Sequence, residues 1–426
     1  MGRLKRAVGG LAAALSLAGA PSPASAASTT ASPASVAFGG EWRERVDLNR
    51  NPRLGLGGPD GFASWQSRLF LHADARLGEA VRVFGELAYA DEQGRKPGAR
   101  SYDESGLDVQ QAFLEVSPTP AARLRLGRQE LAFGDQRLAD VRETSNLHRS
   151  FEAARLDLTL QGARLSAFAG SPVANDPEAF DDAHAEDETF AGVYATAPLS
   201  GADRALDVFW LSRRRPASTF LEGTAKERRE TFGARLHGAA NGFDYSVTAL
   251  GQTGRFGAAD IRAWAASADL GWTRQDWPGA PRLSVRADLA SGDRRAGDGR
   301  LGVFDAPYPN TSYLSTTSPY WPGNAWSIFP LARVQPSAST TAFLGVQTMG
   351  LMSTNDGFYY GAQNPIRLAT GHGRLAMRQI YARLRWTPRP GWTFSGTAIR
   401  QFAGEGVRAA GGGDTSVLSL SADWKF

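Results

Sequence analysis

The sequence predicts an all-β protein: a transmembrane, antiparallel, up-and-down β-barrel of about 18 strands, with 16 as the fallback number. Three observations predict this fold. Polar and apolar side chains alternate along many short segments, the connections between segments alternate between long and short, and no apolar stretch is long enough for a membrane-spanning helix. The 426-residue chain has a mean hydropathy of −0.31, which is too polar for a bundle of membrane helices.

The first 26 residues are typical of a secretory signal peptide. Arg3, Lys5 and Arg6 precede a short apolar stretch, and Ala24-Ser25-Ala26 provides a cleavage site. A membrane anchor or a soluble helix is the alternative. Cleavage near Ala26 removes three basic residues from a total of 47 basic and 43 acidic ones, so the mature chain is nearly neutral and nucleic acid is not an expected partner. The predicted organisation is a signal peptide at 1–26, a short periplasmic segment at 27–35 and the barrel at 36–426.

The alternation is clear in residues 65–77, where Leu69 and Leu71 alternate with Arg68, His72 and Asp74. Successive strand side chains point to opposite faces, so each such segment has one apolar and one polar face. A change of phase near Gln110-Gln111 predicts a β-bulge. The predicted strands are 36–48, 64–77, 80–91, 107–116, 122–133, 151–160, 162–170, 188–197, 204–213, 229–238, 242–252, 261–273, 281–291, 324–335, 339–349, 377–387, 391–402 and 416–426.

The connections separate a membrane barrel from a soluble β-protein. Long connections near 49–63, 92–106, 134–150, 171–187, 214–228, 253–260, 292–323, 350–376 and 403–415 alternate with short turns. Outer-membrane barrels have short periplasmic turns and long extracellular loops, and an even number of strands brings both ends of the barrel to the periplasmic side. The predicted location is therefore the Gram-negative outer membrane, and a secreted soluble β-protein is the alternative.

One stretch carries a family resemblance. Leu126-Gly127-Arg128-Gln129-Glu130-Leu131 followed by Phe133-Gly134-Asp135-Gln136-Arg137 resembles the alginate export family of outer-membrane proteins. Segments 107–115, 291–293, 304–309 and 355–359 fit the same family. The resemblance implies an 18-stranded barrel with an arginine-lined pore, and it assigns to the pore mouth Arg128, Glu130, Asp135 and Arg137.

The expected partners follow from the location and the resemblance. They are outer-membrane lipid and lipopolysaccharide, anionic polysaccharide and periplasmic export proteins. The aromatic C-terminus Trp424-Lys425-Phe426 resembles the signal by which the barrel assembly machinery recognises its clients, so Phe426 is the expected contact.

The polar faces of the predicted strands are rich in arginine, whose planar guanidinium suits carboxylates. Acidic residues such as Glu41, Asp47 and Asp74 share these faces. Two readings therefore stay open: a lumen with net anion selectivity, and a mixed lumen with weak selectivity. The predicted pore-lining, anion-binding residues are Arg43, Arg45, Arg68, Arg76, Arg82, Arg123, Arg125, Arg155, Arg235, Arg286, Arg383 and Arg385.

Three further features lie near the strand ends. Arg128 shares the phase of lipid-facing Leu124 and Leu126, so either the strand bulges at Gly127 or Arg128 lies at the rim. The acidic loop 171–188 is expected to be solvated; the alternative is a Ca²⁺ site. Residues 292–323 could fold into the mouth as a constriction. The Ca²⁺ alternative names Asp181, Asp182, Glu186 and Asp187.

No enzymatic motif is present. The chain has no cysteine, and its five histidines are scattered without metalloprotease spacing, so no catalytic residue and no cofactor is expected. The expected function is an outer-membrane channel for passive passage of anionic polysaccharide or other anionic solutes. The alternatives are a general or substrate-specific porin for small sugars or carboxylates, and a structural, non-conducting barrel.

Overall fold

The computed structural model describes residues 34–57, 61–200, 203–310, 312, 321–359, 365–369 and 371–426. The predicted signal peptide and nearly all of the predicted periplasmic segment lie outside these residues. In the described residues, no helix has the length and hydrophobicity needed to cross a membrane.

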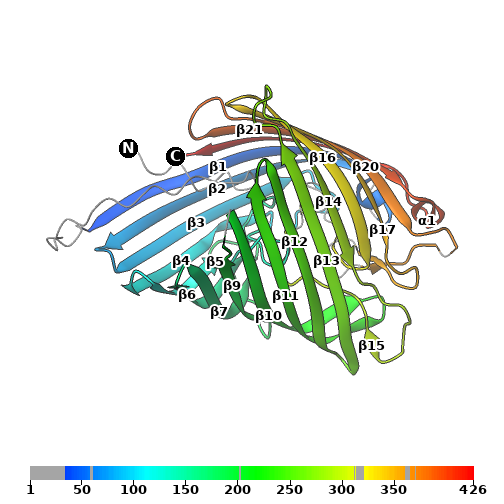
Figure 1. Cartoon of the computed structure of the whole chain (residues 1–426), viewed down its shortest axis with the longest axis horizontal. Helices are drawn as coiled ribbons and strands as arrows, with labels where there is room; N and C mark the ends of the chain where they lie inside the picture. Colours follow the sequence, from blue (N-terminus) through cyan, green and yellow to red (C-terminus); the bar gives the residue numbers. More distant parts are fainter. Residues whose placement is uncertain are drawn as a thin grey trace.

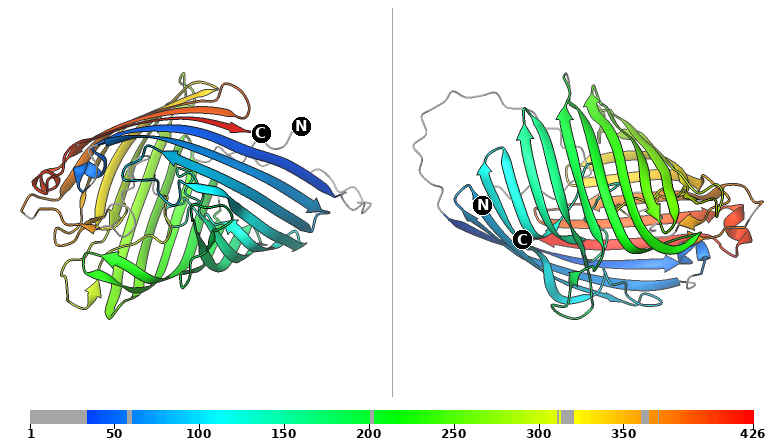
Figure 2. Two further views of the ribbon diagram at one scale, coloured as in Figure 1. Left: turned by 180° about the vertical axis from the view of Figure 1, so that it is seen from behind. Right: turned by 90° about the horizontal axis from the view of Figure 1, so that it is seen from below.

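Eighteen long strands form one closed antiparallel barrel, which confirms the predicted fold class and strand number (Figures 1 and 2). Each strand pairs with its neighbours in the sequence, and β1 closes the ring by pairing with β22, with Trp42 opposite Trp424. Closure gives every strand two partners, so no sheet edge is exposed to lipid. The barrel strands are β1 (Ser35–Arg50), β2 (Gly61–Leu77), β3 (Val81–Gln93), β4 (Ser105–Thr119), β5 (Ala122–Glu130), β6 (Ser150–Leu160), β7 (Ala163–Ala174), β9 (Thr189–Pro198), β10 (Asp203–Phe220), β11 (Gly223–Ala240), β12 (Phe243–Phe256), β13 (Ala259–Thr273), β14 (Arg282–Ala290), β16 (Ala325–Ser337), β17 (Thr340–Leu351), β20 (Leu375–Trp386), β21 (Trp392–Ala403) and β22 (Thr415–Lys425).

The remaining elements are short and belong to the loops. They are η1 (Pro52–Gly55), β8 (Ala183–His184), β15 (Arg300–Leu301), β18 (Phe358–Tyr359), β19 (Pro365–Ile366) and α1 (Glu405–Ala409).

The two faces of the barrel wall differ as the alternation predicts. On β1, Trp42 and Leu48 are 48% and 47% exposed, whereas Arg43 and Asp47 are 5% and 3% exposed. Lipid covers apolar side chains at no cost, so the outward face carries the apolar set and the inward face the polar set. The parity of a strand residue therefore tells whether it faces lipid or lumen.

The two ends of the barrel also differ. One end, the turn end, has short connections and an aromatic cluster in which Trp392 stacks on Trp424 with ring centroids 5.7 Å apart. The other, the loop end, carries long connections, as at the extracellular end of outer-membrane barrels. The predicted bulge is confirmed, because the β3–β4 register skips Gln110.

Two connections predicted to be long are short, which corrects the prediction for 214–228 and 253–260. Strand β10 continues to Phe220 and β11 begins at Gly223, while β12 continues to Phe256 and β13 begins at Ala259. The alternation fails as a signal here because both faces carry polar residues. The inward face contacts a loop inside the barrel, and the outward face carries a row of arginines.

Two long loops fold into the barrel. The first inner loop, residues 131–149, joins β5 to β6. The second inner loop lies between β14 and β16, and its described residues are 291–310, 312 and 321–324. The second coincides with the segment that the sequence places at the mouth. A third connection, between β17 and β20, packs with η1 and α1 at the loop end around Leu54, Phe358 and Val407.

The inner loops correct the expectation of a wholly polar lining. On the wall from β6 to β13, inward-facing Phe168, Tyr194 and Phe209 pack against Phe133 and Phe304 of the two loops. An in-folded loop brings its own apolar side chains, and these need an apolar surface to pack on. The inner face of this wall forms a hydrophobic core with the two loops, and the polar lining lies on the other strands of the barrel.

Candidate functional site: the barrel lumen

The first inner loop is held on β1 by predicted pore arginines. Arg43 donates to the carbonyl oxygens of Glu143 at 2.9 Å and Ser145 at 2.6 Å, and Arg45 donates to that of Thr144 at 2.7 Å. A guanidinium has five donors in a fixed fork and can hold several carbonyls of one loop at once. These two arginines face inward as predicted, but they hold the loop.

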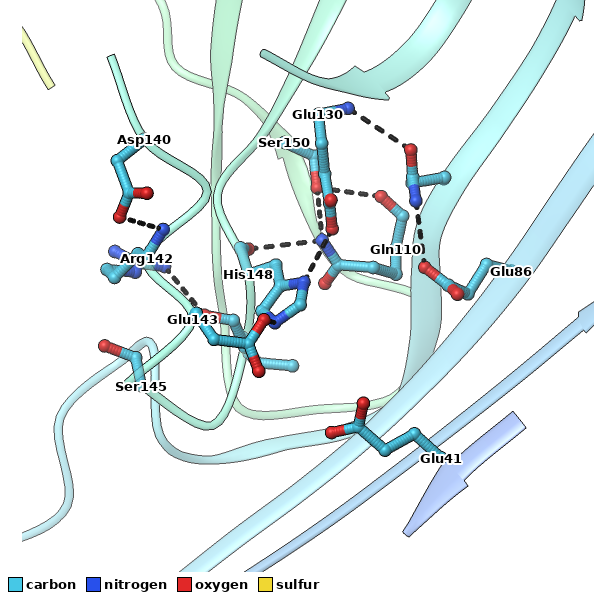
Figure 3. A network of polar contacts seen from close by, with 12 residues as sticks. Glu41, Glu86, Gln110, Glu130, Asp140, Arg142, Glu143, Ser145, His148 and Ser150 are labelled. Carbon is cyan, nitrogen blue, oxygen red and sulfur yellow. Dashed lines mark hydrogen bonds and ion pairs between the residues drawn. The ribbon is translucent and has the colours of Figure 1, made fainter. Parts of the chain in front are cut away.

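A charged network extends this attachment to β2, and Figure 3 shows the part of it around His148, Glu130 and Glu143. Arg68 is fully buried and pairs with Glu41 and, at 3.0 Å, with Glu143. His148 contacts Glu130 at 2.7 Å through Nδ1 and Glu143 at 3.0 Å through Nε2. We call Glu41, Arg68, Glu130, Glu143 and His148 the loop latch.

His148 carries the titratable part of the loop latch. Burial lowers the pKa of His148, but the carboxylates of Glu130 and Glu143 outweigh burial and raise it from 6.5 to about 9. The same imidazolium and Arg68 hold the pKa of the Glu143 carboxyl well below its usual range, against the effect of burial. At neutral pH the latch is therefore an alternation of opposite charges between the loop and the wall.

The second inner loop is held on the opposite wall. Arg213 of β10 donates to the carbonyl oxygen of Pro307 at 2.9 Å and pairs with Asp305 and Glu227. Arg229 of β11 donates to the carbonyl oxygen of Val303 at 3.0 Å. The sequence reasoning missed both arginines because it ended one strand at Arg213 and began the next at Arg229. Both residues are the terminal positions of the predicted strands, and the alternation carried to those positions places both on the lumen face.

The two inner loops join inside the barrel, beside Phe151 of β6 and Phe190 of β9. The amide of Asp140 donates to the carbonyl of Tyr308 at 2.9 Å, and the amide of Tyr308 donates to that of Leu138 at 2.9 Å. Six barrel strands separate β2 from β10 in one direction, and seven separate β12 from β1 in the other. The attachments on β1–β2 and on β10–β12 therefore lie on opposite sides of the ring, and the joined loops form a bridge across the lumen.

The four residues assigned to the pore mouth by resemblance separate into two groups. Arg128 lies on the outward face at the loop end, where it contacts Glu152 at 2.7 Å and the carbonyl of Asp182 at 3.0 Å, and the strand ladder shows no register shift at Gly127. The structure thus matches the rim alternative. Glu130 belongs to the loop latch inside the barrel.

Asp135 and Arg137 lie inside the barrel, on the first inner loop. Arg137 contacts Asp135 at 2.9 Å and Asp288 of β14 at 3.5 Å. They line a pocket between the bridge and the wall, whose other sides include Tyr194 and Arg235. This pocket combines aromatic surface with two guanidinium groups.

The acidic loop forms a cluster different from the one predicted. The carboxylates of Asp108, Asp181 and Asp182 lie within 4.8 Å of one another, whereas Glu186 and Asp187 are not part of this group. Arg128 approaches Asp108 to 3.6 Å, so a protein cation already neutralises part of the cluster.

Near the turn end, neighbouring arginines share single carboxylates. Arg82 and Arg76 contact Asp74 at 2.7 and 3.5 Å, and Arg125 and Arg123 contact Glu115 at 2.6 and 3.4 Å. Each pair of arginines therefore leaves one positive charge uncompensated by its partner. Arg155 and Arg235 differ, since each has its own carboxylate, Asp157 at 2.9 Å and Asp207 at 2.7 Å.

Two arginines of β14 also share one carboxylate. Arg282 and Arg286 both contact Asp269 at 3.2 Å, and Arg282 also contacts Asp244 at 2.5 Å. Arg282 was not among the predicted pore residues, because the short turn before it obscured the phase of β14.

The wall from β16 to β20 carries three arginines that have no carboxylate partner among the described residues. Arg333, Arg383 and Arg385 face inward and are partly exposed, and none of them makes an ion pair with a described residue. Phe343 of β17 lies opposite both Arg333 and Arg383. We call Arg333, Arg383 and Arg385 the open arginines. Arg333 was missed by the sequence reasoning, although it has lumen parity.

Comparisons with known proteins agree with this architecture. Solved structures with the same fold include OpdO of Pseudomonas aeruginosa (TM-score 0.63, 12% identity, 92% of this chain and 97% of that one). They also include OccK2 (OpdF) of the same organism in complex with glucuronate (TM-score 0.59, 13% identity, 92% and 96%). The P. aeruginosa outer membrane protein opdK is a third (TM-score 0.61, 9% identity, 92% and 98%).

At these identities the solved structures establish the fold alone, that of an outer-membrane porin barrel. No curated protein sequence matches the chain. The model of the family described as alginate export matches residues 34–418, which is nearly the whole barrel. The chain therefore belongs to the alginate export family and is an outer-membrane β-barrel channel.

Proposed function

We propose that this channel conducts anionic solutes passively and that its cargo class is uronate, as polymer or as oligomer. Solutes pass beside the bridge and along the turn-end half of the lumen, where they meet guanidinium groups that no carboxylate fully compensates. Arginine pairs with carboxylate in bidentate geometry, and a series of weak contacts lets a polyanion advance without being trapped.

The observation that carries the proposal is the arrangement of charge near the turn end. Arg76 and Arg82 share one acid, as do Arg123 and Arg125, and the open arginines make no ion pair with a described residue. Such a surface has a positive potential, which raises the local concentration of anions and opposes cations. Chemistry plays no part in this passage, so the proposal requires no catalytic residue and no cofactor.

The planar-bilayer test uses the full channel with a potassium chloride gradient and then with added polyuronate. The proposal predicts a reversal potential on the anion side and block by polyuronate from at least one side. A non-selective current would contradict anion selectivity, and an anion-selective current that polyuronate does not block would contradict the polymer cargo. Absence of current would contradict the proposal and support the alternative of a structural, non-conducting barrel.

A second candidate function is a porin for small carboxylates. The bridge across the lumen and the pocket lined by Tyr194, Arg137 and Arg235 favour it, because a narrow passage with aromatic surface and guanidinium groups fits a single ring acid. OccK2, which shares this fold, was crystallised with glucuronate. Current block by glucuronate without block by polyuronate would favour this candidate.

A further inference from the structure

The outward faces of β10 to β13 carry four successive rows of side chains. Rows are defined by residues directly opposite one another on the four strands, and the side chains change in character from row to row. Toward the loop end they read, in order, Val208, Ala234, Ala249 and Ala266; then Trp210, Phe232, Gly251 and Trp264; then Ser212, Glu230, Thr253 and Arg262; then Arg214, Arg228, Arg255 and Asp260.

The aromatic row marks the membrane boundary. Trp210, Phe232 and Trp264 are 38%, 51% and 40% exposed on the lipid-facing surface, above a row of alanine and valine. Aromatic girdles sit where hydrocarbon meets headgroups. Successive outward residues on a strand are about 7 Å apart, so the arginine row lies one to two steps further out, among the headgroups of the outer leaflet.

The outermost row places like charges side by side. Arg214 is directly opposite Arg228, and Arg228 is directly opposite Arg255. Like charges directly opposite on neighbouring strands destabilise a sheet unless an anion lies between them. In the described residues two carboxylates compensate part of this positive charge: Glu230 contacts Arg228 at 3.2 Å, and Asp260 contacts Arg255 at 2.6 Å.

The remaining cations of this face make no ion pair with a described residue. They are the exposed residues Arg214, Arg262 and Lys226, the last lying two residues from Arg228 on β11. Outward Arg128 and Arg400 have carboxylate partners, Glu152 at 2.7 Å and Asp414 at 3.2 Å. Outward Arg378 makes no ion pair with a described residue, but it lies opposite Thr348 and Phe402 and not opposite another arginine. The row of arginines directly opposite one another is thus a local property of β10 to β13.

We propose that this face, the basic rows of β10 to β13, binds the phosphate groups of lipopolysaccharide in the outer leaflet. Guanidinium groups bind phosphate in bidentate geometry. The five cations of this face exceed its two carboxylates, Glu230 and Asp260, by three charges, which suits two phosphate groups. The aromatic and apolar rows below the arginines are where the acyl chains of the same molecule lie. This continuity selects a membrane glycolipid over free phosphate, which needs no apolar surface.

The test measures binding of purified lipopolysaccharide to the detergent-solubilised barrel, by native mass spectrometry and by the shift in melting temperature. The test variant is Arg214→Gln/Arg255→Gln/Arg262→Gln, and the matched control is Arg378→Gln/Arg400→Gln, which removes outward arginines on β20 and β21. Since each basic side chain near an anionic surface contributes about 1 kcal/mol, the triple variant should bind on the order of a hundredfold more weakly. The control should bind like the wild type.

Two further arms decide the source of the phosphate. Lipopolysaccharide stripped of its phosphates should bind the wild type as weakly as intact lipopolysaccharide binds the triple variant, and inorganic phosphate should not compete at equal phosphate concentration. Equal affinity for the stripped glycolipid, unchanged binding by the triple variant, or competition by inorganic phosphate would each overturn the proposal. A heat-modifiable band on a gel, together with unchanged single-channel conductance, shows that the variants are folded.

Discussion

Two walls of the lumen carry arginines that obey the same alternation but meet different surroundings. On β1 and β2, Arg43 and Arg68 are buried under the first inner loop and hold its carbonyl oxygens and carboxylates. On β16 and β20, the open arginines are partly exposed and make no ion pair with a described residue. Strand parity therefore decides that an arginine faces the lumen, and the inner loops decide whether it holds protein or faces the solute.

The two walls should differ most in the free energy of unfolding that is lost when an arginine is truncated, and the largest loss is expected for Arg68. Arg68→Ala removes the buried cation that Glu41 and Glu143 share, so Glu41 keeps only Lys425 and Glu143 only His148. Removing one partner of a buried ion pair costs about 3–5 kcal/mol. The free energy of unfolding should fall by that amount, and the single-channel conductance should rise because the first inner loop is released. Urea titration and bilayer recording measure the two effects.

The matched control is Arg383→Ala on β20, which only β21 and β22 separate from β1. It breaks no ion pair with a described residue, so its free energy of unfolding should change by less than about 1 kcal/mol. Equal destabilisation by the two substitutions would remove the distinction between the walls.

A smaller effect is expected from pH, through the loop latch. The pKa of His148 is raised to about 9, so its charge stabilises the docked loop fully below about pH 6.5, and this contribution is lost as the pH rises through about 9. Conductance should therefore increase between about pH 8 and pH 10. His148→Gln should show the high-pH conductance already at pH 7 and lose the dependence; a dependence that survives in this variant would assign it to another group.

The smallest expected effect is a gain in anion selectivity. Asp269→Asn removes the carboxylate that Arg282 and Arg286 share, while Asp244 still holds Arg282. One more positive charge near the turn end should shift the reversal potential modestly toward the anion limit and strengthen block by uronate. A shift toward cations would contradict the role given to these arginines.

Much of the fold could be predicted from the sequence, because a lipid-exposed barrel needs strict alternation and that pattern is local. All eighteen strands were located, and the bulge at Gln110 was visible as a change of phase. The strand extensions beyond Arg213 and Gln252 were not predicted, because the alternation of apolar and polar residues ends where both faces become polar.

The site was less predictable, because the parity of a strand residue tells which way its side chain points but not which residue it contacts. Arg43, Arg45 and Arg68 looked the same in sequence as Arg383 and Arg385. Only the path of the first inner loop, whose residues are distant in sequence from β1, separates the two groups. The contacts of Arg213 and Arg229 were not predictable for the same reason, because their partners lie about 75 to 95 residues away in the second inner loop.

The central claim is that uncompensated arginines near the turn end make this channel select anions. The most direct measurement is the reversal potential, in a salt gradient, of Arg333→Ala/Arg383→Ala/Arg385→Ala beside the wild type and the outward control Arg378→Ala. We expect an anion-side potential for the wild type and the control, and a potential much closer to zero for the triple variant. A triple variant that keeps the wild-type potential would contradict it.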